Sequence, residues 1–223
     1  MRPVLIGVLL VLAACAGRGR PATDPTAFSC YAAPNLSQVQ RVVVVPLWRA
    51  QGVGRSALVL DEALATSLRE LGRFEVLRLS EADRDELLGA DAVAANSVPS
   101  DALRRVFQRH RADAVLIGRI EHLHSYDPVA IGLAAHLVSC LDGTVLWSAS
   151  GHFDGARHDV QTDLRAWHDA TVGDNVGELG GWQAALSSPR LFARYVSDRV
   201  AASVLAPPPS AAGIRPGSHP LPR

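Results

Sequence analysis

The sequence contains no lysine, and its 22 basic residues are all arginines. This absence excludes an enzyme that forms a Schiff base on a lysine and a P-loop that holds phosphate with one. The formal net charge is zero, so the chain lacks the positive surplus with which proteins bind nucleic acid. Aromatic residues make up only 5% of the chain, but hydrophobic residues make up 48%. That is enough apolar material for one hydrophobic core.

The apolar run from Val4 to Ala14 is too short to cross a bilayer, which takes roughly 20 residues. It follows one positive charge, Arg2, and ends in small residues, which is the pattern of a secretory signal peptide. The stretch Leu12-Ala-Ala-Cys15 resembles the lipobox of bacterial lipoproteins, whose cysteine becomes the acylated, palmitate-bearing first residue. We therefore predict a signal peptide over 1–14 and a lipid anchor at Cys15. The alternative is an ordinary signal peptide that has a cysteine near its end.

Composition divides the rest of the chain into three parts. Residues 15–38 show no apolar period, so we predict a flexible tether from Cys15. Residues 39–206 carry the periodic segments and predict a single α/β domain. Residues 207–223 are rich in Pro, Gly and Ser and predict a disordered tail.

Within the domain, hydrophobic periodicity predicts the order β-α-β-α(α)-β-β-β-α. Helix starts are expected at Ser56, Ser80, Ser100 and Ser188, since serine is a favoured cap. We expect a mixed β-sheet packed against helices, with a C-terminal strand meander and a closing helix. The strands are expected at 41–48, 74–77, 112–126, 131–141 and 144–153. The polar stretch 155–181 reads as a long loop.

Asp142-Gly143 predicts a tight hairpin between the last two strands. With a two-residue turn, Val138, Cys140, Val145 and Trp147 would share one face of the sheet.

Two cysteines remain besides the anchor, Cys30 and Cys140. In an oxidising envelope compartment they could form a disulfide. The alternative is a buried apolar thiol at Cys140 and a free thiol at Cys30.

The histidines are candidates for metal ligands. His122 and His124 lie two apart in a strand and so point to one face. The tight hairpin places His136 opposite Ala149 and His152 opposite Leu133, on different faces, so a four-histidine cluster would need a slip in register. We therefore predict histidines exposed on the sheet, with no metal and no cofactor.

The segment 154–169 is crowded with acidic residues and histidines. It has neither the spacing of a calcium loop nor a nucleophile in an activating motif. We therefore predict no catalytic residue and no enzymatic activity, and keep a metal site or enzyme built on this loop as an alternative. The acidic residues and histidines on which this alternative would rest are Asp154, His158, Asp159, Asp163, His168 and Asp169.

Four motifs together resemble a bacterial superfamily of envelope lipoprotein domains. It includes the curli secretion channel lipoprotein, the lipoprotein activators of penicillin-binding proteins and the amino-terminal domain of the Tol-system propeller protein. The resemblance implies an α/β domain that binds partner proteins or assembles with itself, without catalysis. The motifs are Val42-Val-Val-Val-Pro46-Leu, Leu68-x-x-Leu-x-x-Phe74-x-Val-Leu, Ala112-Asp-Ala-Val-Leu-Ile-Gly118 and Leu141-Asp-Gly-Thr-Val-Leu-Trp147-Ser.

The chain departs from two of these relatives. A secretion channel needs long amphipathic hairpins, but Pro99 interrupts 90–100 and 155–181 lacks sustained alternation. The tether is also short for a synthase activator, which must reach the cell wall. We predict an accessory protein, anchored at the periplasmic face of the outer membrane, that acts through protein–protein contacts in cell-envelope or surface-structure assembly. The alternative within the family is a self-assembling subunit of an export apparatus.

Overall fold

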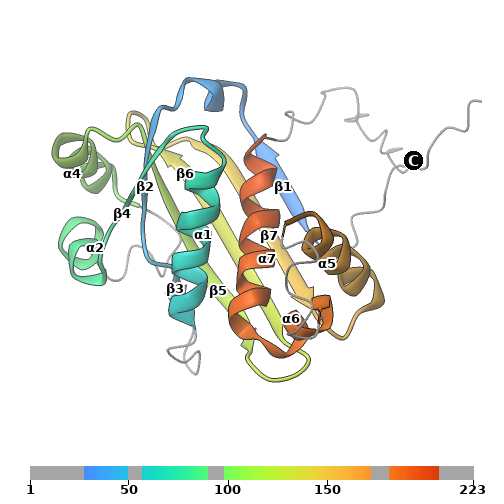
Figure 1. Ribbon diagram of the computed structural model, residues 1–223. Helices are drawn as coiled ribbons and strands as arrows, with labels where there is room; N and C mark the ends of the chain where they lie inside the picture. Colours follow the sequence, from blue (N-terminus) through green and yellow to red (C-terminus); the bar gives the residue numbers. More distant parts are fainter. Residues whose placement is uncertain (1–27, 50–56, 90–97, 172–180, 206–223) are drawn as a thin grey trace, which may run out of the picture.

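The computed structural model describes residues 28–49, 57–89, 98–171 and 181–205. Its strands form one seven-stranded mixed sheet in the order β1-β7-β6-β5-β2-β4, with β3 paired to β5 (Figure 1). The predicted class is confirmed: a mixed α/β sheet packed against helices, with a strand meander followed by a closing helix. The strands are β1 (Ser29–Ala32), β2 (Arg41–Val44), β3 (Trp48–Arg49), β4 (Glu75–Arg78), β5 (Ala114–His124), β6 (Ala130–Ser139) and β7 (Val145–Asp154). The α-helices are α1 (Leu58–Glu70), α2 (Glu81–Leu88), α4 (Ser100–His110), α5 (His158–Thr171), α6 (Ala184–Ser187) and α7 (Pro189–Ala202), and the short 3-10 turns are η1 (Pro34–Gln38), η4 (Gly181–Gln183) and η5 (Ser203–Leu205).

Strand β2 lies in the parallel half of the sheet, between β4 and β5. Val42 and Val44 belong to the hydrophobic core on one face, whereas Val43 and Val45 belong to the core on the other. All four are buried. A continuous β-branched run suits a strand that is covered on both faces, so the prediction of a doubly buried strand is confirmed.

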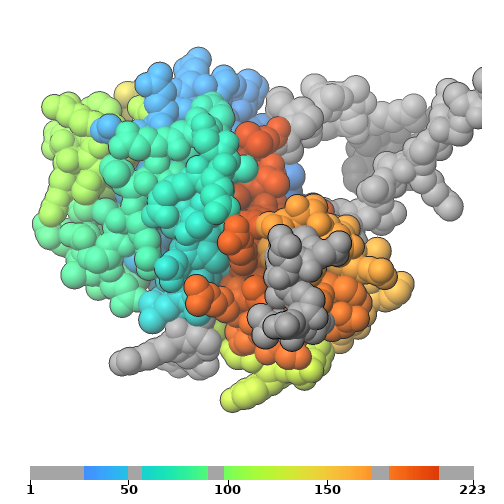
Figure 2. All heavy atoms as spheres, in the orientation of Figure 1, coloured from blue at the N-terminus to red at the C-terminus, as the bar shows by residue number. Residues whose placement is uncertain are grey.

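The larger of the two cores, called here the main core, lies under α1, α5 and α7 and contains Trp147, Phe192 and Tyr195. In the space-filling view, α1 and α7 lie in contact and hide most of the strands from this side (Figure 2). The second core lies on the opposite face, where α2 and α4 pack against β2, the first half of β5 and the end of β6. No described helix covers the rest of that face, over β1, β7, most of β6 and the second half of β5; we call it the open face.

Helix starts agree with the predictions in two of four places. Ser80 caps α2 in a full capping box with Asp83, and the Ser188 hydroxyl accepts a hydrogen bond from the Leu191 amide at the start of α7. At α4 the prediction was wrong, because Pro99 occupies the cap and Ser100 is already helical. Ser56 lies outside the described residues.

The predicted boundary of the domain at residue 39 was wrong. Ser29–Ala32 form the edge strand β1, which pairs antiparallel with β7 from Ser29↔Ser150 to Ala32↔Trp147. The segment carries no apolar period of its own because only Ala32 of β1 is buried. It is held by a strand more than a hundred residues away, which composition cannot reveal.

The polar stretch 155–181 also differs from the prediction of a loop. Most of it forms α5, which buries Val160, Leu164 and His168. Only three of its fourteen residues are buried, so the apolar stripe is too thin to stand out from the polar background.

The hairpin between β6 and β7 is wider than predicted. The Ser139 amide donates to the Thr144 carbonyl at 2.9 Å, so four residues close the strands instead of two. Asp142 supports this loop, since its carboxylate accepts from both the amide and the hydroxyl of Thr144 at 3.1 and 2.9 Å. A further irregularity follows between Leu137 and Val138. The predicted common face was therefore wrong: Trp147 pairs with Leu137 in the main core, whereas Val138 and Cys140 lie in the second core.

Gly118, the last residue of the Ala112–Gly118 motif, is expected to tolerate no side chain. A Cβ there would lie 2.7 Å from the Ala134 carbonyl oxygen and 2.8 Å from Leu47 Cδ2. Gly118→Ala should lower the free energy of unfolding by about 1–3 kcal/mol, since overpacking forces β5 and β6 apart. Urea denaturation measures the change. Ala134→Ser on the neighbouring strand is the matched control; Gly72→Ala does not serve, because Gly72 has φ +61°. An equal loss of stability in Gly118→Ala and Ala134→Ser would contradict the steric argument.

Candidate functional site

Three acidic residues of 154–169 have partners within the fold, and one of them joins two helices. Asp163 accepts hydrogen bonds from the Tyr195 hydroxyl at 2.8 Å and pairs with Arg199 at 2.9 Å, which ties α5 to α7. Asp154 accepts from the Ala156 amide at 2.9 Å. The hydrogen bond from Arg157 holds the pKa of Asp159 below its ordinary value. Among the described residues, no three His, Cys, Asp or Glu side chains are placed to hold a metal ion together.

The two cysteines are both free, so the disulfide considered from the sequence is absent from the structure. Cys30 is exposed on β1 opposite Ala149, whereas Cys140 is buried in the second core beyond the end of β6. Ala149 is paired with Ala135, five residues before Cys140. At about 3.3 Å per residue along a strand, the two Cα atoms are separated by roughly 17 Å or more, far beyond the reach of a disulfide.

The reactivity of the two thiols tests the placement of Cys30 at the surface and Cys140 in the second core. Burial raises the pKa of the Cys140 thiol to about 12, so almost no reactive thiolate is present at neutral pH. With Ellman's reagent, Cys30 is expected to react rapidly in the native protein and Cys140 only after denaturation. Cys30→Ser provides the matched control, which should show no rapid phase. A native protein with no titratable thiol would contradict the structure.

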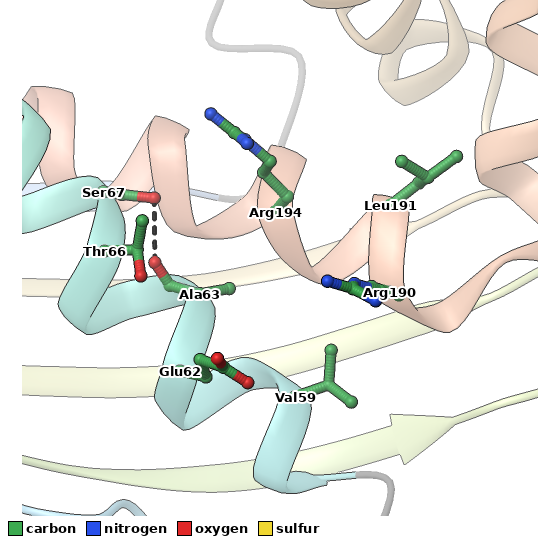
Figure 3. A pocket seen from close by; sticks show the side chains of 8 residues that line it. All are labelled: Val59, Glu62, Ala63, Thr66, Ser67, Arg190, Leu191 and Arg194. Atoms are coloured by element: carbon green, nitrogen blue, oxygen red, sulfur yellow. Dashed lines mark hydrogen bonds between the residues drawn. The ribbon is translucent and has the colours of Figure 1, made fainter.

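A hollow of about 320 Å³ lies between α1 and α7 (Figure 3). Glu62 on α1 and Arg190 on α7 stand on opposite sides of it, and the Ser67 hydroxyl donates to the Ala63 carbonyl at 3.0 Å. The single hydroxyl proton of Ser67 is shared with Asp198, which also accepts from the Trp167 indole at 2.9 Å. Asp198 thus joins α1, α5 and α7 beneath the hollow. Of the polar side chains that line the hollow, Ser67 and Arg194 contact Asp198 and so belong to this joint.

A buried ion pair stands where the parallel strands end. Asp61 on α1 is 3% exposed; its carboxylate accepts from the Leu47 amide at 2.8 Å and pairs with Arg49, which also reaches Glu81 at 2.9 Å. Burial raises the pKa of Asp61 despite these partners. Open α/β sheets often bind ligands at this edge, but here the pair fastens β3 to α1 and α2.

Exposed apolar side chains gather around a second hollow, of about 260 Å³, between α4 and the β6–β7 loop. Leu141 at the loop is 93% exposed and Phe107 on α4 is 44% exposed. Leu103 and Arg104 line the same hollow. We call the surface formed by Leu103, Arg104, Phe107 and Leu141 the loop patch. The loop patch was not predicted from the sequence, although a leucine inside a turn that is otherwise polar was a usable signal.

The irregularity between Leu137 and Val138 shifts the pairing of β6 and β7 by one residue, which brings together the histidines that the predicted register separated. His136 pairs with Ser148, and His152 pairs with Gly132, not with Leu133. A second irregularity, between Ile120 and His122, turns His122 away from the main core. All four sheet histidines, 122, 124, 136 and 152, therefore lie on the open face.

The sites predicted before the domain lie outside the described residues: the signal peptide 1–14, the lipid anchor Cys15 and most of the tether. So does the tail 207–223. Among the residues that the structure describes, no helix is long and apolar enough to cross a membrane.

No family model and no curated protein matches the chain. Among solved structures it is similar to the PelC dodecamer from Paraburkholderia phytofirmans, with a TM-score of 0.50 and 16% identity over 80% of this chain and 96% of that one. It is also similar to lipoprotein GNA1162 from Neisseria meningitidis (TM-score 0.39, 21% identity, 51% and 79% of the two chains) and to LpoB from E. coli (0.34, 15%, 68% and 81%).

At 16% identity, the similarity to the PelC subunit establishes a shared fold. The class that it supports is a mixed α/β domain, which is the fold that the resemblance in the sequence implied.

Proposed function

We propose that this chain is a lipid-anchored accessory protein of the bacterial envelope that acts through protein–protein contacts, without catalysis. Its place is the periplasmic face of the outer membrane, and its task is the assembly of the envelope or of a surface structure. The resemblance of Leu12-Ala-Ala-Cys15 to a lipobox and the fold shared with PelC support this proposal.

The loop patch is the observation that carries the proposal. Leu141 is almost fully exposed beside Phe107 and a hollow with largely apolar walls. An apolar side chain held in water at a loop tip stabilises nothing in the monomer, and clustered exposed apolar groups mark surfaces that bind other proteins. Arg104 at its border supplies the charged rim common to such surfaces.

The short length of chain between Cys15 and the folded domain agrees with action near the membrane. Because the fold begins with β1, only 13 chain steps separate Cys15 from Phe28. Even fully extended they span at most about 45 Å. A domain held so close to its anchor meets partners at the membrane surface and not across the periplasm.

A second candidate is a self-assembling subunit of an export apparatus. It is favoured by the PelC structure, which is a dodecamer and which this chain covers over 96% of its length. We favour the alternative of a metal site or enzyme on 154–169 less, since three of its carboxylates, Asp154, Asp159 and Asp163, accept hydrogen bonds within the fold.

Light scattering on the detergent-extracted, lipidated protein, repeated for soluble Cys15→Ala, tests the proposal. A monomer or dimer supports the accessory protein, and crosslinking in the envelope then identifies its partner. A closed ring of many copies overturns it in favour of the self-assembling subunit.

The loop patch is tested by Leu141→Ser, with Tyr126→Ser as the matched control. Tyr126 is 78% exposed in the loop between β5 and β6, outside the patch. Leu141→Ser is expected to reduce crosslinking or assembly about tenfold, whereas Tyr126→Ser should leave it unchanged. Equal behaviour of both variants would remove the loop patch from the interface.

A further inference from the structure

Three neighbouring strands align two histidines across a glycine on the open face. His122 on β5 and His152 on β7 are both paired with Gly132 on the middle strand β6. Residues paired in this way point to the same side of a sheet. Both imidazoles are exposed, and their ring centroids lie only 5.6 Å apart, with the rings tilted by 47°.

The glycine makes this approach possible. A Cβ at position 132 would lie 3.2 Å from Nδ1 of His152 and 3.2 Å from Cβ of His122. The His152 ring therefore leans over the middle strand into the space that a side chain would take. Side chains two strands apart are normally separated by about 9–10 Å, twice the strand spacing, so the short distance between the rings follows from the missing side chain.

The spacing matches two imidazoles that share one metal ion. With a metal–nitrogen distance of about 2.0–2.1 Å and a tetrahedral angle, the two ring centres stand about 5–6 Å apart. We infer that His122 and His152 form a two-histidine site for a divalent first-row transition ion such as Zn²⁺ or Cu²⁺. Imidazole suits these ions, and copper binds more tightly than zinc to a given nitrogen site.

The next row of the sheet is compatible with such a site. His124 and Asp154 flank Ala130 as the two ligands flank Gly132. Nδ1 of His124 lies 3.2 Å from the Pro128 carbonyl, which can only accept, so Nδ1 is the donor of this hydrogen bond. Because no three suitable side chains of the described part lie close enough, water or an incoming ligand completes the coordination sphere.

His136 stands apart from this pair. Burial and the nearby charge of Arg119 both lower its pKa, and the same positive charge repels a metal ion. The site therefore rests on His122 and His152.

Calorimetric titration of the full-length protein in detergent with ZnCl₂ and CuCl₂ tests the inference. A Cys30→Ser background keeps the exposed thiol from competing for the ion. One ion per chain is expected, and His122→Gln or His152→Gln should each weaken binding at least about tenfold, because one of two ligands is lost. His158→Gln, an exposed histidine on α5, is the matched control and should bind as the parent does.

Gly132→Ala gives an independent readout, since it removes no ligand but places a Cβ against Nδ1 of His152. It is expected to weaken binding while the far-UV circular dichroism stays that of the parent; if that spectrum changes, the two glutamine variants carry the test alone. Absence of saturable binding in the folded parent, or binding unchanged in both glutamine variants, overturns the inference.

Discussion

Replacing Trp147 by alanine is expected to lower the free energy of unfolding by about 3–5 kcal/mol, the usual range for a buried tryptophan. Trp147 on β7 is completely buried in the main core, and its indole N–H donates to the Ser203 hydroxyl at 3.2 Å. Removal opens a cavity between β7 and the end of α7 and leaves Ser203 without that donor. Urea denaturation followed by far-UV circular dichroism measures the loss without relying on tryptophan fluorescence.

Two variants separate the contributions of Trp147. Trp147→Phe loses the indole N–H but keeps most of the apolar volume, so a smaller loss is expected. Ser203→Ala removes the acceptor and should cost about 1–3 kcal/mol, since the indole N–H is then buried without a partner. A loss below about 1 kcal/mol for Trp147→Ala would mean that β7 is not packed as described.

Asp61→Ala is expected to lower the free energy of unfolding by about 2–4 kcal/mol. The substitution leaves the Leu47 amide buried without an acceptor and removes one half of the pair with Arg49. Asp61→Asn should cost less, because its side-chain carbonyl still accepts from Leu47. Glu81→Ala is the matched control: Glu81 is the exposed partner of Arg49, and an exposed pair contributes about 1 kcal/mol or less.

The pH dependence gives a second readout for Asp61. Burial raises its pKa above the ordinary carboxyl value, so the folded state holds this proton more tightly than the unfolded chain. The contribution of Asp61 to stability is therefore greatest below the ordinary carboxyl pKa and is lost as the pH rises through the folded-state pKa. Denaturant titrations at several pH values should show this slope in the parent and not in Asp61→Asn; the same slope in both would assign it to another group.

Much of the fold followed from local patterns in the sequence. The valine run of β2 predicts a strand buried on both faces, Ser80 and Ser188 mark two helix starts, and the apolar stripe of the last helix predicts its burial. These features depend on neighbouring residues and on periodicity, which a sequence displays directly.

The candidate surfaces were less predictable. The loop patch is formed by α4 and the β6–β7 loop, more than thirty residues apart in sequence. Among the histidines, the sequence placed His122 and His124 on one face correctly but separated His136 from His152 by the wrong hairpin register. Gly132 inside a strand was the available warning, since a glycine there often marks a bulge or a close approach.

The sequence by itself determined the elements of the central sheet and its helices, the closing helix and the resemblance to envelope lipoprotein domains. Only the tertiary structure decided the register of β5, β6 and β7, the addition of β1 to the edge and the burial of α5. The physical reason is that a strand's register depends on its partners and on bulges, and a slip of one residue moves each side chain to the other face. That one-residue difference is what brings His122 and His152 together across Gly132.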